Sequence, residues 1–294
     1  MIVNWLAPAL LSALMLGFYD VCKKHAVREN AVMPVLFCAT ASGSLLYVLL
    51  VLCNGTLGAA VRCSGEHFAL IAIKSLLVSG SWVLVYYAMR ELPISLASPV
   101  RSSAPLWTAA GGIAVFGEIP TPLQGIGMAT VLAGYGIFSF LGSREGFSLR
   151  SRGMVLIAAG TLLGACSALF DKYLLSVRMI DRQVLQFYFS VDLVVLLGAG
   201  YLIRRCCGKA HKMVWRWTIP ATGMLLVIAD YLYFYVLSMD NAPISLVSLV
   251  RRSGCAVSFV VGVWLFHDRN VKRKAWALAL LFAGIILIAV GKNF

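Results

Sequence analysis

Four basic side chains lie inside long apolar stretches of this sequence, where a charged group is costly unless it has a use. A planar guanidinium group can bind a phosphate or carboxylate through two parallel hydrogen bonds, and a lysine ammonium adds a positive field. Basic groups that converge inside apolar segments therefore predict a binding site for an anion. The four candidates are Arg101, Arg251, Arg252 and Lys74.

Two acidic residues, Asp192 and Asp230, also lie deep in apolar stretches. Four cations against two anions leave a surplus of positive charge, which favours a water-filled cavity that receives an anionic ligand. Other interpretations stay open. The charges could form internal ion pairs that only hold the protein together, and each carboxylate could either neutralise a nearby cation or carry protons.

Arg101 and Arg251 belong to two copies of one segment. Residues 93–103 read PISLASPVRSS and residues 243–253 read PISLVSLVRRS, so eight of eleven letters agree at a spacing of 150 positions. The same spacing pairs Glu118 with Asp268. The chain is therefore predicted to be an internal duplication, with its halves at residues 1–147 and 148–294.

Asp20 and Asp171 occupy equivalent positions near the ends of apolar segments in the two halves. Each has lysine close by in the sequence, Lys23 for the first and Lys172 for the second. We expect these acids to neutralise their neighbouring lysines or to cap helix ends rather than to bind a ligand.

The composition is that of a membrane protein. Hydrophobic residues make up 61% of the chain and charged residues 13%, whereas soluble proteins carry roughly 25% charged residues. Apolar windows of about 20 residues, long enough to cross a bilayer, recur along the whole chain. The first lacks a basic residue before its apolar stretch and is expected to be a mature helix rather than a signal peptide.

We expect ten transmembrane helices, at residues 3–22, 32–53, 67–90, 94–117, 121–142, 153–176, 183–203, 218–239, 244–266 and 275–291.

Each half would contain five crossings. Because this number is odd, the second half must enter the membrane from the side opposite to the first. The expected fold is an all-α integral membrane protein in which two inverted five-helix repeats form one transmembrane domain. Inverted repeats are typical of transporters, whose binding site lies near the midplane between the repeats.

The net charge of +13 follows the predicted topology. The joints on one side of the membrane, with Arg90 at the end of the third predicted helix, hold 16 of the 25 Lys and Arg residues, and the other joints with the two termini hold 4. The basic side should be cytoplasmic, which would place both termini outside. The basic residues thus imply no nucleic-acid partner; the expected partners are membrane lipids, a small-molecule metabolite and, as an open option, a second copy in a homodimer.

No catalytic or metal-binding spacing is present. The eight cysteines contain no C-x-x-C pair, and the four histidines form no H-E-x-x-H motif. A polytopic enzyme would need a nucleophile, base or metal cluster at one membrane face. We therefore expect no enzyme activity, no metal and no cofactor.

Two short motifs carry a family resemblance. The run YYAMRELPISL from Tyr86 to Leu96 joins the third and fourth predicted helices, and Phe116-Gly117-Glu118 closes the fourth. In this order the chain resembles the EamA-type branch of the drug/metabolite transporter superfamily. The resemblance implies a multi-pass transporter that works by alternating access. It also implies cytoplasmic termini, in opposition to the charge count.

The segments around the arginines are also similar to those of triose-phosphate translocators, another branch of that superfamily. Val100-Arg101 and Val250-Arg251-Arg252 match the positions that hold the substrate phosphate there. Ala104 replaces a glutamate of that pattern, and only Lys172 could match its lysine from the sixth helix. The resemblance further implies a tyrosine from the eighth helix, for which Tyr231 is the candidate and Tyr233 and Tyr235 are alternatives.

These observations together predict a secondary active transporter in a bacterial plasma (inner) membrane. Its expected substrate is a small organic anion, phosphorylated or carboxylated, held by the three arginines with Lys74 and Tyr231. Asp192 and Asp230 would compensate charge or carry protons. The alternative is an exporter of amino acids or other zwitterionic or drug-like metabolites.

Overall fold

The computed structural model describes residues 5–27, 30–91, 101, 103–140, 151–207, 213–239, 242–254, 257 and 271–291. Within these ranges the chain is helical and contains no strand. A π-helical turn, η1 (Tyr173–Val177), directly continues α8. The α-helices are α1 (Leu6–Val27), α2 (Val32–Cys53), α3 (Leu57–Ala60), α4 (Gly65–Glu91), α6 (Ala104–Phe116), α7 (Pro122–Phe140), α8 (Arg152–Lys172), α9 (Arg182–Cys206), α10 (Thr218–Leu237), α11 (Ile244–Arg252) and α13 (Val271–Val290).

Every segment predicted to cross the membrane overlaps one of these helices, and α2 has the predicted bounds. The short helix α3 and the π-helical turn were not expected. The first, fourth, fifth and ninth predicted segments fall only in part within the described residues, the fourth and ninth with the larger gaps. The all-helical class is confirmed for the described residues, and six described helices are long and apolar enough to cross a bilayer: Leu6–Val27, Val32–Cys53, Gly65–Val85, Arg152–Val177, Arg182–Cys206 and Thr218–Leu237.

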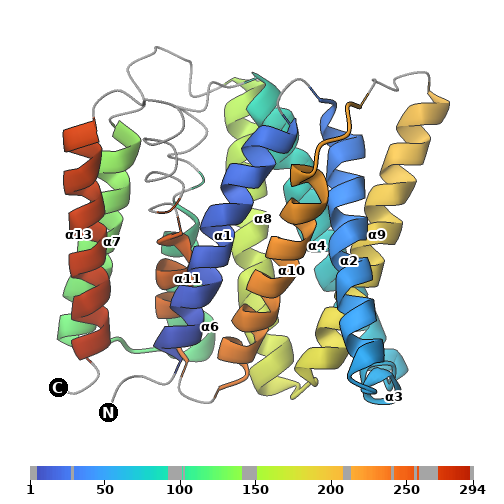
Figure 1. The fold of residues 1–294 in the computed structure, drawn as a ribbon. Coiled ribbons are helices and arrows are strands. Elements are labelled where there is room, and N and C mark those ends of the chain that lie inside the picture. The colour runs from blue at the N-terminus through green and yellow to red at the C-terminus, as the bar shows by residue number, and fades with distance from the viewer. Residues whose placement is uncertain are drawn as a thin grey trace.

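The helices lie side by side in one bundle (Figure 1). Apolar sequence on all sides suits this arrangement, because a helix satisfies its own backbone groups and can face either lipid or a neighbouring helix. α7 and α13 pack together at one edge, and α2 and α9 pack together at the other (Figure 1). Between them α1 packs against α10, and α4 packs against α8.

Polar side chains mark where two of the helices begin. Ser151 accepts a hydrogen bond from the Met154 N–H at the start of α8. Asp181 accepts hydrogen bonds from the Gln183 and Val184 N–H groups at the start of α9. Both side chains satisfy backbone donors that have no partner within the helix.

α2 and α10 approach most closely at Gly43 and Gly223. A Cβ atom added to Gly223 would lie 1.7 Å from the Ala39 carbonyl oxygen, and one added to Gly43 would lie 2.5 Å from the Gly223 carbonyl oxygen. Only glycine fits at such distances, so these residues bring the two backbones together. This contact sets the distance between α2 and α10, the two helices that line both pockets described below.

Candidate functional site

Lys74 of α4 is the largest fully buried side chain of the described core. Its Nζ lies 3.2 Å from Oδ1 of Asp171 in α8, and the two side chains are 1% and 8% exposed. The same Nζ lies 3.0 Å from the ring centroid of Phe189 and 4.9 Å from that of Phe234. A carboxylate and two aromatic faces thus surround the ammonium, and both kinds of group attract a cation.

Arg251 of α11 forms an ion pair with Asp230 of α10. Its guanidinium carbon lies 4.1 Å from the ring centroid of Tyr233, and its Nε donates to Ser12 Oγ at 3.4 Å. Ser12 in turn donates to the Ala229 carbonyl at 2.7 Å. The arginine is therefore held by groups from α1 and α10, which lie in different halves of the sequence.

The two ion pairs belong to one electrostatic network. Lys74 and Asp171 each interact through space with Asp230 and with Arg251. We call these four residues the charge quartet. Its two cations and two anions balance within the set.

Asp192 of α9 lies beside the quartet rather than within it. Its Oδ2 accepts a hydrogen bond from Ser75 Oγ at 3.1 Å, and its charge acts on Lys74, the residue before Ser75. Asp192 is half-buried. It therefore adds negative charge to the surroundings of Lys74 without forming the contact that Asp171 makes.

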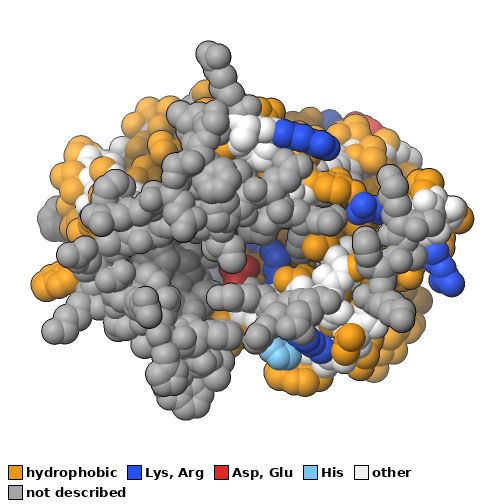
Figure 2. All heavy atoms as spheres, turned by 90° about the horizontal axis from the view of Figure 1, so that it is seen from above, with side chains coloured by type: hydrophobic (Ala, Val, Ile, Leu, Met, Phe, Trp, Pro, Cys, Tyr) orange, Lys and Arg blue, Asp and Glu red, His pale blue; other side chains and the backbone are white. Residues whose placement is uncertain are grey.

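Arg101 and Arg252 are grouped with Lys23 of α1 instead. The charge of Lys23 is repelled by those of both arginines and attracted by that of Asp20. Arg101 is half-buried and Arg252 is exposed. Figure 2, which views the bundle from above, shows acidic and basic side chains together near the middle of that face. We call Lys23, Arg101 and Arg252 the basic cluster.

The tyrosines of α10 take different positions. Tyr231, the predicted candidate, is 37% exposed and has the guanidinium carbon of Arg182 5.8 Å from its ring centroid. Tyr235 is paired with the same arginine at 4.6 Å. Tyr233 is 4% exposed and is the tyrosine that contacts Arg251.

The structure thus brings together Lys74, Asp230 and Arg251 from the predicted set. It adds Asp171, which forms an ion pair with Lys74, while Lys172 donates to the Ala242 carbonyl at 2.8 Å. The sequence signal for Asp171 was its repeat partner Asp20. The position of Asp171 was interpreted as the end of a helix, although the helix continues past Asp171 into η1.

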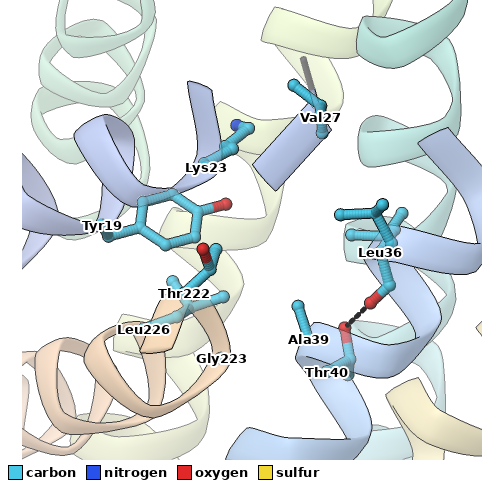
Figure 3. A pocket seen from close by; sticks show the side chains of 10 residues that line it. Tyr19, Lys23, Val27, Leu36, Ala39, Thr40, Thr222, Gly223 and Leu226 are labelled. Atoms are coloured by element: carbon cyan, nitrogen blue, oxygen red, sulfur yellow. Dashed lines mark hydrogen bonds between the residues drawn. The ribbon is translucent and has the colours of Figure 1, made fainter. Parts of the chain in front are cut away.

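Two adjoining pockets lie between α2 and α10 and share Thr40, Gly223 and Leu226. In the first, Tyr19 and Lys23 of α1 face Thr222 and Leu226 of α10 across from α2 (Figure 3). The Thr40 hydroxyl there donates to the Leu36 carbonyl at 2.8 Å (Figure 3).

The second pocket is small, with a cavity volume of about 20 Å³. Asp230 of the quartet lines it, so the pocket reaches the ion pair with Arg251. Among the described residues no group of three or more His, Cys, Asp or Glu side chains could hold a metal ion. The remaining lining residues come mainly from α2, α4, α9 and α10: Thr40, Ser44, Trp82, Gln186, Phe189, Ser190, Leu193, Gly223, Leu226 and Val227.

Known proteins resemble this chain in sequence and in fold. Residues 3–140 match the EamA-like transporter family. A dipeptide and tripeptide permease A of Edwardsiella piscicida is 25% identical over 181 residues, which are 58% of this chain and 35% of the permease. The chain thus spans about a third of that protein's length. A solved crystal structure of a protein matches with a TM-score of 0.78 and 15% identity, over 98% of this chain and 97% of the other, which shows a shared fold.

Proposed function

Because residues 3–140 match the EamA-like transporter family, we propose that the chain transports a small zwitterionic metabolite, such as an amino acid, across a bacterial plasma membrane. Together with the permease, the family match identifies a membrane transporter rather than an enzyme. Of the two substrate classes predicted from the sequence, the zwitterion suits the geometry better.

The charge quartet is the observation that carries this proposal. Its pair of Arg251 and Asp230 is the more accessible one, with side chains 21% and 16% exposed against 1% and 8% for Lys74 and Asp171. A zwitterion can open that pair at little cost, because its carboxylate replaces Asp230 on the arginine and its ammonium replaces the arginine on Asp230. Every charge then keeps a partner.

A simple anion would leave a charge without a partner. It would bind Arg251 and leave the Asp230 carboxylate without a counter-charge, in a site that is largely shielded from water. Leaving one member of a buried pair uncompensated costs about 3–5 kcal/mol. The balance of charge in the quartet therefore disfavours a purely anionic substrate at this position.

Alternating access between two inverted five-helix halves, residues 1–147 and 148–294, is the proposed mechanism. The helix pairs support it. Counting only the predicted membrane segments, the first of each half packs against the third of the other half: α1 packs on α10, and α8 packs on α4. The second, fourth and fifth segments each pack against their counterpart in the other half, as α2 with α9, α6 with α11 and α7 with α13. Two halves related by a twofold axis in the membrane plane would produce this reciprocity.

A second candidate is the organic anion predicted from the sequence, now placed at the basic cluster. Lys23 interacts through space with both Arg101 and Arg252. An anion among them would be attracted by each. Lys23 also lines the first pocket, which offers an entry to this position.

Uptake into proteoliposomes tests both candidates with matched probes. L-α-amino acids are compared with the carboxylic acids that lack only the amino group, using the wild type and the variants Arg251→Gln, Asp230→Asn and Arg101→Gln. We expect preference for the amino acids and roughly ten- to hundredfold losses in Arg251→Gln and Asp230→Asn. Preference for the des-amino acids, lost in Arg101→Gln but not in Asp230→Asn, would establish the second candidate instead.

A further inference from the structure

The geometry points to the second pocket, between α2, α4, α9 and α10, as the subsite for the substrate's ammonium group, with Gln186 as a hydrogen-bond acceptor for that group. This inference rests on the proposed function, because it assigns one end of the zwitterion to a place. It adds a residue, Gln186, that neither the sequence motifs nor the ion pairs had identified.

Gln186 of α9 is 1% exposed. Its Nε2 donates to the Val227 carbonyl of α10 at 2.9 Å. Because a carbonyl can only accept, this bond fixes which end of the side-chain amide is nitrogen. The other end, Oε1, is buried and accepts no hydrogen bond from any group in the described part of the chain.

A buried acceptor without a donor is unusual, since most buried polar atoms have at least one partner. Gln186 lines the second pocket together with Asp230. The amide oxygen and the carboxylate therefore belong to one small space. A ligand that brings hydrogen-bond donors there would satisfy both.

Two hydroxyl groups of the pocket, those of Thr40 and Ser44, also face a ligand as acceptors. Thr40 already donates to the Leu36 carbonyl at 2.8 Å, and Ser44 already donates to the Ser190 carbonyl at 2.7 Å. Each hydroxyl has one hydrogen, so only the lone pairs of its oxygen remain for a ligand. An ammonium group has three donors and no acceptor. It complements these two hydroxyl oxygens and the Asp230 carboxylate, whereas a carboxylate would meet acceptors of its own kind at those three groups.

The aromatic wall of the pocket suits a cation as well. Phe189 lines the pocket and already has the Lys74 ammonium 3.0 Å from its ring centroid. Trp82, the aromatic residue type that attracts cations best, lines the same space. Asp230 supplies the opposite charge, and α2 and α10 bring the walls together at Gly223.

The test uses purified full-length protein and a panel of L-α-amino acids, each paired with the carboxylic acid that lacks only the amino group. Binding is measured by calorimetry for the wild type, Gln186→Leu and Gln186→Glu. We expect Gln186→Leu to weaken binding of the amino acids roughly ten- to a hundredfold and to leave the des-amino acids unchanged. Gln186→Glu keeps an acceptor and should retain the preference for the amino acids.

Gln124→Leu serves as the matched control. Gln124 is also a buried glutamine, but its Oε1 accepts from the Thr121 N–H at the start of α7, on the edge of the bundle. Any general effect of losing a buried amide appears in that variant as well, and melting temperatures of all variants report folding. Gln124→Leu should bind both members of each probe pair as the wild type does.

Two results would overturn the subsite: amino acids that bind Gln186→Leu as tightly as the wild type, or equal losses for both members of each pair. The proposed function is judged separately by Arg251→Gln, which should weaken both members because both carry the carboxylate. Loss in Arg251→Gln without selective loss in Gln186→Leu refutes the ammonium subsite alone. A wild type that binds no amino acid of the panel refutes the subsite and the proposed function together.

Discussion

Lys74 Nζ and Asp171 Oδ1 lie 3.2 Å apart between α4 and α8, with almost no exposure to solvent. A buried charge that loses its nearest counter-charge is destabilising, so removal of either partner should cost more than removal of both. We expect Lys74→Met and Asp171→Asn each to lower the free energy of unfolding by about 3–5 kcal/mol, and the double variant to lose less than the sum. Melting temperatures in detergent for the four proteins complete this cycle.

The ion pair of Arg178 and Glu66 is a matched control for that cycle. Its side chains are 31% and 67% exposed, so water screens the interaction. Glu66→Gln should change stability by less than about 1 kcal/mol. If Asp171→Asn proves as mild as Glu66→Gln, the buried pair is not what holds α4 against α8.

The positions of the helices could be predicted from the sequence, because bilayer thickness fixes the length of an apolar segment and the polar joints stand out from it. The contact partners of each charge could not. Tyr231 and Tyr233 are two positions apart in α10, and two residues correspond to a rotation of roughly 200° around a helix. One tyrosine therefore meets Arg182 and the other meets Arg251, a difference that depends on how α10 is rotated in the bundle.

The same limit applies to the acids. Asp230 was identified as a deep acid, and its pairing with Arg251 follows from the packing of α10 and α11, which composition does not encode. Asp171 was placed near a helix end, where it was expected to neutralise Lys172 or to cap the helix, whereas the π-helical turn continues the helix and Asp171 is buried in the core. Helix ends are the least certain feature of a sequence-based assignment.

Glu118, just beyond the end of α6, holds the start of α11. One of its oxygens accepts from the Ile244 N–H at 2.7 Å, and the other accepts from Ser245 N–H at 3.1 Å and Ser245 Oγ at 2.7 Å. Both oxygens face donors, so Glu118→Gln must turn an NH₂ group toward one of them. We expect a loss of about 1–3 kcal/mol in stability and, because α11 carries Arg251, reduced uptake.

Asp181→Asn is the control for this effect. Asp181 also accepts from backbone N–H groups at a helix start, but a single oxygen, Oδ1, makes both bonds with Gln183 and Val184. Asparagine keeps that oxygen and caps helices as well as aspartate does. Its melting temperature should stay near that of the wild type. Equal behaviour of Asp181→Asn and Glu118→Gln would contradict the structural role assigned to Glu118.

The contact of α2 with α10 makes a third prediction. Gly223→Ala would place a methyl group 1.7 Å from the Ala39 carbonyl oxygen, which belongs to the backbone and cannot turn away. The helices must separate, at a cost of about 1–3 kcal/mol or more, and the two pockets between them change shape. Gly125→Ala in α7 has nothing within 4 Å of the added atom and should be neutral or slightly stabilising. Melting temperatures and substrate affinity of both variants check this difference.

Cysteine labelling tests the orientation predicted from the charge count. Cys63 follows α3, which lies at the lower end of the bundle, whereas Cys206 and Cys207 close α9 at the upper end (Figure 1). Variants that keep either Cys63 or Cys206, with all other cysteines replaced by serine, are treated with an impermeant maleimide on intact cells. If the basic side is cytoplasmic, Cys63 reacts and Cys206 reacts only after permeabilisation. The opposite pattern would mean that the termini are cytoplasmic.

The pH dependence of the reaction provides the internal check. Burial raises the pKa of the Cys63 thiol, so at neutral pH a smaller fraction is thiolate, the form that attacks the reagent. We expect slow labelling of Cys63 near neutral pH and a rate that climbs with pH until the pH passes the raised pKa. A rate that already levels off at neutral pH would contradict the burial of this thiol. Labelling across a pH series therefore separates a slow but accessible Cys63 from one that faces the cytoplasm, because only the accessible thiol gains reactivity as the external pH rises.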